Sequence, residues 1–421
     1  MAMAYEQTHP WITFELDLGK APPPLWIALG EAYSKCQHLA GVPLKPEIAS
    51  KLHQIYLAKG IHATTAIEGN TLNERQVLDR IQGKDVVPKS QQYLEKEVDN
   101  VLASANLVMD EVEDKGIVPI TSDEIKKLNK SILTGLELED RVIPGEYRKY
   151  QVGVLDYEGA PWEDCPYLID QLSAWLNSDN FVGPGKDQRI IYGIVKSIIA
   201  HIYMAWIHPF GDGNGRTARM LEVKFLMEAG IPSSAIYLLS NHYNATRVEY
   251  YRRLSQISKN GGDVIPFLDY AVRGFVDQLR DQLEAVKAQQ WGVSWQNFIY
   301  EVFGPEKTIA DKRQIALLLA LSETDDFVPK NNLRRLTPRL AEMYAGKTSK
   351  TLTRDLNSLA RRKMIQSGPK GVRARKELIL AFLPRTRMGD FEAQLEHAKR
   401  MKAEEGHLQL DLLSLLEDSP R

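Results

Sequence analysis

The feature that most constrains this sequence is a stretch from Ile190 to Ile207 that is apolar on nearly every side of a helix. A helix on the surface of a protein shows apolar residues along one stripe, so this stretch predicts a helix buried at the centre of a domain. A lysine, a serine and a histidine interrupt it, so we do not expect it to span a membrane. His208 and Pro209 predict its end, because a residue before proline is disfavoured in the α region.

Helical patterns dominate from about Leu25 to Val286, and the fold class expected is mainly α. Thr121 and Glu124 have the spacing of a capping box and predict the start of one helix. The one convincing strand pair is the stretch Ile143 to Val154, where a Pro-Gly turn signal precedes β-favouring residues. A small β-hairpin is therefore expected beside the helices.

Charge, cysteine count and the N-terminal segment argue against a membrane-bound, disulfide-rich or exported protein. The 421 residues carry a net charge of −2, which gives no overall attraction to nucleic acid or membranes. The two cysteines, Cys36 and Cys165, are too few for a disulfide framework and lie in no metal-binding spacing. The segment Met1 to Trp11 does not resemble an export signal. These observations predict a cytoplasmic protein with no membrane partner.

The region 306–385 differs from the rest, with 18 lysines and arginines against 8 acids. Three helical patterns are followed by two short β runs, Met364-Ile365 and Leu378 to Phe382, and this order is typical of a winged helix-turn-helix. Basic residues concentrated on such a module favour contacts with DNA phosphates. The candidate DNA contacts are Lys350, Thr351, Arg354 and Arg373. A role in dimerisation or in docking a target is equally compatible with the pattern.

The segment His208 to Arg219 combines the groups that phosphate transfer requires. His208 can accept a proton near neutral pH, and Asp212 offers a hard oxygen to a metal ion. Gly213, Asn214 and Gly215 open the next helix, whose free N–H groups favour anions. The final side chains, Arg216 and Arg219, are three residues apart and share one helix face.

This segment resembles the signature of the Fic (filamentation induced by cAMP) domain family, H-P-F-x-[DE]-G-N-G-R-x-x-R, at every fixed position. The resemblance implies a Fic-type helical bundle and a protein adenylyltransferase, which transfers AMP from ATP to a hydroxyl side chain of a target protein or of itself. It implies that His208 is the general base and that Asp212 holds Mg²⁺ or Mn²⁺. The remaining implied phosphate-binding residues are Gly213, Asn214, Gly215, Arg216 and Arg219.

A second motif matches the same family. Thr64, Glu68 and Gly69 fit the inhibitory pattern [ST]-x-x-x-E-[GN], and the resemblance implies a salt bridge from Glu68 to Arg219 that keeps ATP from its productive pose. Locally these residues end a helix, and Thr71 with Glu74 predicts a capping box for the next one. Some relatives use the same glutamate to remove AMP from modified targets, and the sequence leaves that activity open.

Further contacts are implied by position. Gly145, Tyr147 and Arg148 correspond to the start of a hairpin flap that docks the target's main chain. Tyr250 and Tyr251 follow the loop and are candidates for adenine contacts, although aromatic residues at helix spacing are more often core.

The expected domains are a helical region 1–110 with an inhibitory helix around 58–69, a catalytic core 111–290, the winged helix 306–385 and a helical tail 386–421. Related two-domain proteins, many of them bacterial, imply a homodimer. The sequence leaves two other functions open: a DNA-binding regulator with a Fic sensor domain, and a phosphotransferase of the Doc type.

Overall fold

The computed structural model describes residues 3–154, 157–185 and 188–379, and within them the chain divides into two compact units, 3–283 and 284–379. Each unit has its own hydrophobic core. The predicted segments 1–110 and 111–290 do not have separate cores, because one apolar cluster extends from Ile12 to Leu279. The predicted tail 386–421 lies outside the described residues.

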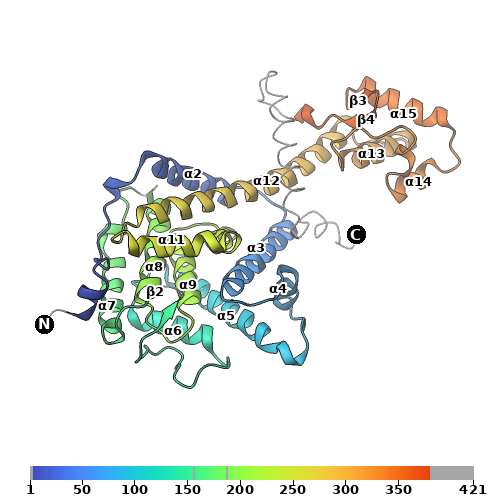
Figure 1. The fold of residues 1–421 in the computed structure, drawn as a ribbon. Helices are drawn as coiled ribbons and strands as arrows, with labels where there is room; N and C mark the ends of the chain where they lie inside the picture. Colours follow the sequence, from blue (N-terminus) through green and yellow to red (C-terminus); the bar gives the residue numbers. More distant parts are fainter. Residues whose placement is uncertain (1–2, 155–156, 186–187, 380–421) are drawn as a thin grey trace. The chain divides into compact units, whose positions relative to one another are not determined.

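The first unit is mainly α, as predicted (Figure 1). Its helices are α1 (Ala4–Thr8), α2 (Pro23–Ala40), α3 (Pro46–Ile67), α4 (Glu74–Ile81), α5 (Gln92–Lys115), α6 (Ser122–Leu133), α7 (Cys165–Leu176), α8 (Arg189–Ile207), α9 (Asn214–Glu228), α10 (Leu238–Ala245), α11 (Arg247–Lys259) and α12 (Ile265–Phe303), which continues into the second unit. Short 3₁₀ turns lie at Leu18–Lys20, Lys89–Gln91, Trp162–Asp164 and Asp179–Phe181.

The predicted central helix is α8, and it packs along α9 through most of its length. Gly193 permits this close approach, since a Cβ there would lie 2.3 Å from the Cβ of Ala229 at the end of α9. α8 is long and apolar enough to cross a membrane, but 78% of its apolar stretch is buried inside the protein. Its apolar surface is therefore used in the core of the first unit.

The break between α8 and α9 falls where the sequence predicts it, with one difference in geometry. His208 leaves the helix in the left-handed conformation, with φ 48° and ψ 57°, rather than in the extended region common before proline. Gly213, with φ 76°, ends the loop, and α9 begins two residues earlier than the predicted Arg216. We refer to residues 208–213 as the catalytic loop.

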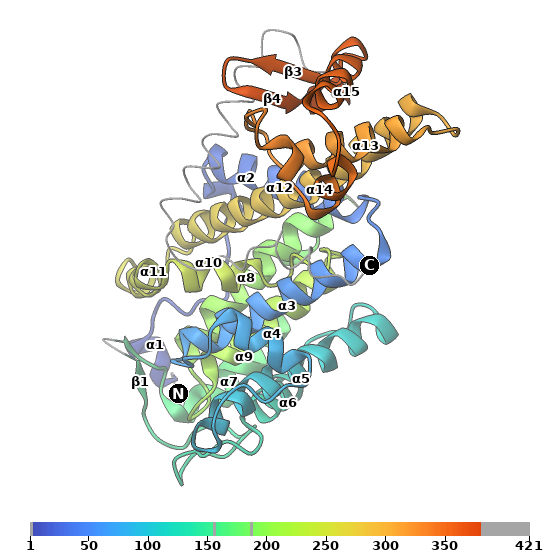
Figure 2. The same cartoon turned by 90° about the vertical axis from the view of Figure 1, so that its right-hand side faces the viewer.

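The helices around this pair hold α3 in place. Figure 2 shows α3 alongside α9 and α5, and it also packs on α10. The capping box predicted at Thr121 and Glu124 is confirmed, with N–H to oxygen distances of 2.9 and 3.2 Å. The one predicted at Thr71 is wrong: Asn73 and Gln76 form it, because α4 begins at Glu74 itself.

The β element of this unit is smaller and later than predicted. Strand β1 (Gly153–Val154) pairs antiparallel with β2 (Tyr157–Glu158), whereas the stretch Ile143 to Val152 is irregular apart from one bridge between Tyr147 and Phe210. Of the β-favouring residues before Gly153, Tyr147 therefore pairs with the catalytic loop, and the others form no ladder.

In the second unit, three helices precede a hairpin, the order the sequence predicts. They are α13 (Ile309–Ser322), α14 (Pro338–Tyr344) and α15 (Ser349–Arg361), with 3₁₀ turns at Leu333–Arg335 and Lys376–Ile379. Strand β3 (Ile365–Gly368) pairs antiparallel with β4 (Gly371–Ala374). The second strand was predicted at Leu378 to Phe382, but β3 pairs with β4 across a Gly-Pro-Lys-Gly turn and Leu378 and Ile379 lie in a 3₁₀ turn, while residues 380–382 lie outside the described residues. The winged-helix interpretation stays a prediction.

The contact of α3 with the start of α10 gives a test of this packing. A Cβ on Gly60 would lie 2.3 Å from the Cβ of Tyr237, so Gly60→Ala must push α3 away and should lower the free energy of unfolding by about 1–3 kcal/mol. Gly30→Ala in α2 is the matched control: its Cβ would meet nothing within 4 Å, and we expect about 0.5–1 kcal/mol of stabilisation. Urea denaturation measures both, and equal stabilities would contradict the packing described.

Candidate active site

The catalytic loop is closed by its own side chains. Phe210 is buried, and its N–H donates to Asn214 Oδ1 at 3.0 Å while Asn214 Nδ2 donates back to the Phe210 carbonyl at 2.9 Å. The Asn214 side chain is thus engaged within the loop and buried. Only the main chain of Asn214 can still bind a ligand. It lies at the start of α9, where the first N–H groups of a helix lack intrahelical partners. The loop therefore presents a helix N-terminus, which favours an anion.

Asp212 and Arg216 lie beside that N-terminus. One Arg216 nitrogen lies 3.0 Å from Asp212 Oδ1, and another lies 3.6 Å from a carboxylate oxygen of Glu97. Arg216 is nearly buried, with two guanidinium nitrogens that have no hydrogen-bond partner among the described residues. These N–H groups are suited to donate hydrogen bonds to an anionic ligand.

Asp212 is the carboxylate predicted to hold a metal ion. Its side chain is 46% exposed, and the described residues contain no group of three or more His, Cys, Asp and Glu that could hold a metal. Mg²⁺ commonly binds one or two carboxylates and takes its other ligands from water and substrate phosphates. Asp212 fits that pattern of binding, in which the nucleotide completes the site.

The motif around Glu68 meets the loop directly. A Glu68 carboxylate oxygen lies 2.5 Å from a guanidinium nitrogen of Arg219, which also donates to the Thr64 carbonyl at 3.0 Å. Arg219 is fully buried. Burial acts to raise the pKa of Glu68, but the charge of Arg219 outweighs it and the net pKa is lowered. The pair is therefore ionised at neutral pH.

Glu68 also occupies space over the first turn of α9. A Cβ on Gly215 would lie 2.3 Å from a Glu68 carboxylate oxygen, so only glycine fits at this position in the present arrangement. Gly69, with φ 105°, turns the chain away after the glutamate. The motif around Glu68 thus places a carboxylate beside the N-terminus of α9, which favours anions.

The end of α3 is fastened by two more side chains. Arg247 donates to the Ala66 carbonyl at 3.1 Å, and the Tyr251 hydroxyl donates to the Ile67 carbonyl at 3.3 Å. These carbonyls belong to the last turn of the helix, which has no intrahelical donors of its own. The position of Glu68 is therefore set by contacts from α11 as well as by Arg219.

His208 is neutral at pH 7. Burial, followed by the positive charge of Arg148, lowers its pKa to about 4. The carboxylates of Glu68 and Asp212 act in the opposite direction and are weaker. A neutral imidazole is the form that can accept a proton.

The predicted adenine contacts do not hold for Tyr250. Its ring is buried and stacked on Tyr243 with centroids 4.8 Å apart, and its hydroxyl lies 2.8 Å from His201 Nε2. It is a core residue, because its only polar group is used in the interior. Tyr251 is half-buried and tied to α3 as described above, so its contact with a base stays a prediction.

The three residues predicted to start the flap make different kinds of contact in the structure. Tyr147 pairs with Phe210 through the main chain, and Gly145 adopts φ 81° where the chain turns. Arg148 is buried, and its guanidinium donates to the carbonyls of His208, Tyr150, Ile207 and Ala160. The Arg148 side chain therefore acts inward, on the catalytic loop, and docking of a target on the main chain of this flap stays a prediction.

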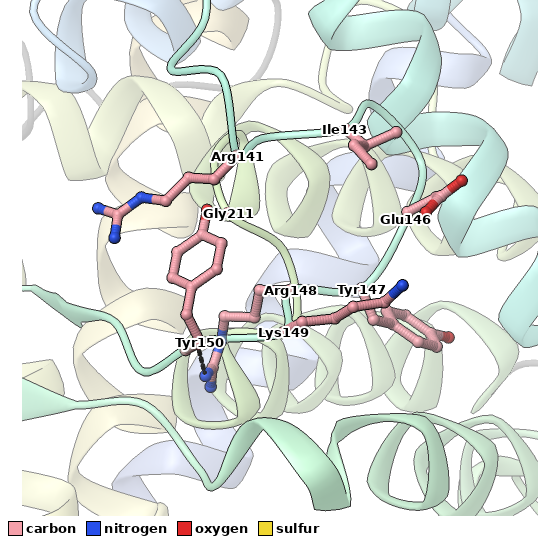
Figure 3. Close-up of a pocket in the computed structure, with 8 residues that line it drawn as sticks. All are labelled: Arg141, Ile143, Glu146, Tyr147, Arg148, Lys149, Tyr150 and Gly211. Atoms are coloured by element: carbon pink, nitrogen blue, oxygen red, sulfur yellow. Dashed lines mark hydrogen bonds between the residues drawn. The ribbon is translucent and has the colours of Figure 1, made fainter.

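A small hollow lies between residues 141–150 and the catalytic loop (Figure 3). Its volume is about 150 Å³, and its lining residues are Arg141, Ile143, Glu146, Tyr147, Arg148, Lys149, Tyr150 and Gly211. A Cβ on Gly211 would lie 2.3 Å from the Tyr150 hydroxyl, so a larger residue there would have to displace the Tyr150 side chain. The hollow thus adjoins the catalytic loop three residues after His208.

The candidate DNA contacts belong to the second unit. Lys350 and Arg354 are exposed on α15, and Thr351 is half-buried there. Arg373 lies on β4 with its guanidinium carbon 5.3 Å from the centre of the Phe327 ring.

Asn129 was missed by the sequence reasoning. It is fully buried on α6, and its Nδ2 donates to the Asp212 carbonyl at 2.9 Å. Its signal was present, since Asn129 shares the apolar face of α6 with Ile125, Leu128 and Ile132. A polar residue on such a face requires hydrogen-bond partners.

Comparison with known proteins adds to this geometry. Residues 119–226 match the Fic/DOC family. The chain is 31% identical to the protein adenylyltransferase Fic of Nematostella vectensis over 216 residues, which are 51% of this chain and 45% of that protein. It is 29% identical to the protein adenylyltransferase fic-1 of Caenorhabditis elegans over 230 residues, 54% of this chain and 41% of that one. The match spans less than half the length of these relatives.

Solved structures agree on the fold. A Fic family protein from Desulfovibrio desulfuricans G20 superposes with a TM-score of 0.52 at 21% identity, covering 84% of this chain and 96% of that chain. Residues 134–508 of Fic-1 from C. elegans give a TM-score of 0.51 at 25% identity, covering 62% of this chain and 72% of that one.

The lowered pKa of His208 can be measured by NMR titration of the imidazole. We expect a midpoint near pH 4, well below the 6.5 of a free histidine. In Glu68→Gln the midpoint should move lower still, because a negative charge that favours the protonated ring is gone. Since the unfolded chain binds the proton first, His208 should also make folding stability fall as pH drops from 6.5 towards 4. A midpoint near 6.5 would contradict the burial described.

Proposed function

We propose that this chain, a Fic family protein by the match of residues 119–226, transfers AMP from ATP to a hydroxyl group of a protein and is restrained by its own Glu68. One observation carries the proposal: the Glu68 carboxylate is bound to Arg219 at 2.5 Å, over the helix N-terminus that closes a complete catalytic loop. A site without a phosphate-binding task would have no use for a removable anion at this point.

Each group has a task in the transfer. His208 accepts the proton of the target hydroxyl, whose oxygen attacks the α-phosphorus of ATP. A bond from that oxygen to phosphorus forms, the bond from phosphorus to the β-phosphate oxygen breaks, and pyrophosphate leaves. Asp212 would hold Mg²⁺ or Mn²⁺, which neutralises charge on the phosphates. The N–H groups of Gly213 to Gly215 and the guanidinium of Arg216 bind the phosphates.

Arg219 is the switch in this scheme. While Glu68 neutralises it, Arg219 cannot contact the terminal phosphate, and the carboxylate repels the same phosphate by charge. Release of Glu68 exposes a guanidinium and a helix N-terminus together, two features that attract anions. The resting protein is therefore expected to bind ATP in a pose that does not react.

The target protein would dock on the segment 143–154. Its main chain already pairs with the catalytic loop at Phe210 and at Pro209, which the Arg148 N–H contacts at 2.9 Å. The hollow beside Gly211 is large enough for a side chain that neighbours the modified residue. Lys149 and Arg141 are exposed at this hollow and would favour an acidic neighbour. Serine, threonine and tyrosine are all compatible with this docking.

Replacing the glutamate tests the proposal. Glu68→Gly should raise AMP incorporation into the chain itself and into lysate proteins at least tenfold, because Arg219 is freed for the nucleotide. The measurement uses ATP labelled at the α-phosphate, with ATP labelled at the γ-phosphate in parallel. The double variant Glu68→Gly, His208→Ala is the control and should show no transfer, since the base is missing.

The position of the transferred label on ATP distinguishes adenylylation from phosphotransfer. Transfer of the α label alone supports adenylylation, whereas transfer of the γ label alone would make the chain a phosphotransferase of the Doc type. Equal incorporation by wild type and Glu68→Gly would refute the inhibitory role of Glu68. No transfer of either label would leave a binding or regulatory function for the Fic domain.

We propose a second function, DNA binding by the second unit, on one specific observation. Between Lys347 and Lys376 there are ten basic residues and one acid, Asp355. Asp355 is buried, and it accepts hydrogen bonds from Arg313 at 2.6 and 3.0 Å and from the Tyr344 hydroxyl at 2.9 Å. The acid points inward, so the exposed surface of α15 and the hairpin carries positive charge only, which suits the phosphates of a duplex.

Fluorescence anisotropy of a random-sequence DNA duplex tests this proposal. Arg354→Ala should weaken binding of the full chain and reduce the slope of log affinity against log salt by about 1, as expected when one phosphate contact is lost. Lys312→Ala, an exposed lysine on α13, is the matched control and should bind as wild type does. Absence of salt-sensitive binding would favour dimerisation or target docking for this unit.

The homodimer rests on the resemblance alone, and the cytoplasmic location rests on the cysteine count and the N-terminal segment. A homodimer and a cytoplasmic location stay predictions.

A further inference from the structure

The segment 145–150 and the catalytic loop are joined at more points than their main-chain bridge requires. Two buried side chains, Arg148 and Asn129, each hold an atom of the loop's main chain. One belongs to the segment itself and the other to α6. Both side chains are buried and make their hydrogen bonds to groups of this chain, so each is placed to hold the loop in position.

Arg148 holds the end of α8. Its Nε donates to the His208 carbonyl at 2.7 Å and a terminal nitrogen donates to the Ile207 carbonyl at 3.4 Å. Its hydrogen bonds in the described part of the chain all go to main-chain carbonyls, and none goes to a carboxylate. A cation that satisfies the free carbonyls of a helix end is favoured by the helix dipole.

These bonds matter because His208 adopts a costly backbone conformation. Its φ of 48° lies in the left-handed region, which disfavours a side chain by about 1–2 kcal/mol. A residue persists there only when its surroundings hold it. Arg148 supplies such a hold on the carbonyl side of His208, while the His208 N–H is bound to the Met204 carbonyl at 3.0 Å.

Asn129 holds the opposite end of the loop. Besides the Asp212 carbonyl, its Nδ2 lies 3.3 Å from the Thr217 hydroxyl, and its Oδ1 accepts the Gly145 N–H at 2.9 Å. Thr217 in turn donates to the Gly213 carbonyl at 2.7 Å. One buried amide therefore connects the start of the segment 145–150 with the residues that lead into the N-terminus of α9.

We propose that Arg148 and Asn129 are positioning residues that clamp the target-docking segment to the catalytic loop, Arg148 orienting the base His208 and Asn129 orienting the phosphate-binding end at Asp212 and Gly213. The proposal rests on the proposed function for the reaction it serves. It assigns the two residues different effects, because the base acts in the chemical step and the helix N-terminus acts in nucleotide binding.

The role of Arg148 is tested in the Glu68→Gly background, by measuring the rate of AMP incorporation. Arg148→Met should lower kcat on the order of 100-fold, the effect of misplacing a reacting group by about 1 Å, and leave KM for ATP within about twofold. The matched control is Arg189→Met, which removes an arginine that donates to the Ala229 carbonyl at the end of α9, far along the chain from the loop. The control should keep its kcat.

The pH profile separates positioning from general damage. Glu68, Asp212 and Arg148 are the charged groups that act on His208, and the Glu68→Gly background leaves Asp212 and Arg148. Removing the positive charge of Arg148 should move the acid limb of kcat to higher pH. Arg148→Lys keeps the charge without the several hydrogen bonds, so it should lower kcat but leave the acid limb in place.

The role of Asn129 is tested with the same assay. Asn129→Ala should raise KM for ATP at least tenfold with a smaller change in kcat. Asn100→Ala is its matched control: Asn100 is buried on α5 and donates to the Ile132 and Thr134 carbonyls at 3.0 and 2.8 Å, so it loses the same kind of bonds without touching the loop. The control should lose similar stability in urea and keep its KM.

The outcomes are distinct from those of the proposed function. If Glu68→Gly transfers no AMP, the proposed function fails, and the clamp is then read from the NMR signals of the His208 imidazole, which should shift in Arg148→Lys, where the charge is kept, and stay unchanged in Arg189→Met. If Glu68→Gly is active but Arg148→Met and Asn129→Ala behave as their controls do, the clamp is wrong. A parallel fall of kcat and rise of KM in both variants would also overturn it, because the two ends of the loop would not be held separately.

Discussion

The close packing of α8 on α9 is the constraint on which the site depends. Gly193 and Ala229 bring the far ends of the two helices together, and the near ends are joined by the six residues of the catalytic loop. α8 ends inside the core, so its last carbonyls lack helical partners before the loop. The first N–H groups of α9 lack them after the loop. The carbonyls are satisfied by Arg148, and the N–H groups form the anion site. Base and phosphate-binding groups are therefore positioned by the same packing.

Electrostatics then determine the state of this site. It is built to attract an anion, with two buried arginines and a helix N-terminus, and in the resting chain the anion is the carboxylate of Glu68. An internal carboxylate competes with a nucleotide phosphate at no cost in association entropy, because it is already tethered to α3. Inhibition of this kind requires α3 to be held firmly, which the contacts of Gly60, Arg247 and Tyr251 provide.

The sequence predicted the fold class, the buried helix, the loop and the capping box at Thr121, because each depends on a local pattern. Where it failed, the deciding contact was distant. Arg148 was assigned only to the start of a hairpin flap, and the carbonyls that it satisfies lie about sixty residues away at the end of α8. Tyr250 could not be assigned to the core without His201 and Tyr243 beside it. Asn129 carried a readable signal, a polar side chain on an apolar helix face, whose partners only the fold reveals.

The central claim is that a competent site is restrained by Glu68 through Arg219. Crystal structures of wild type and of Glu68→Gly with a non-hydrolysable ATP analogue and Mg²⁺ test it most directly, through the distance from His208 Nε2 to the α-phosphorus and the partner of Arg219. In Glu68→Gly, Arg219 should contact the terminal phosphate and the α-phosphorus should face His208, whereas in wild type Arg219 should remain on Glu68. The same nucleotide pose in both proteins would contradict the account.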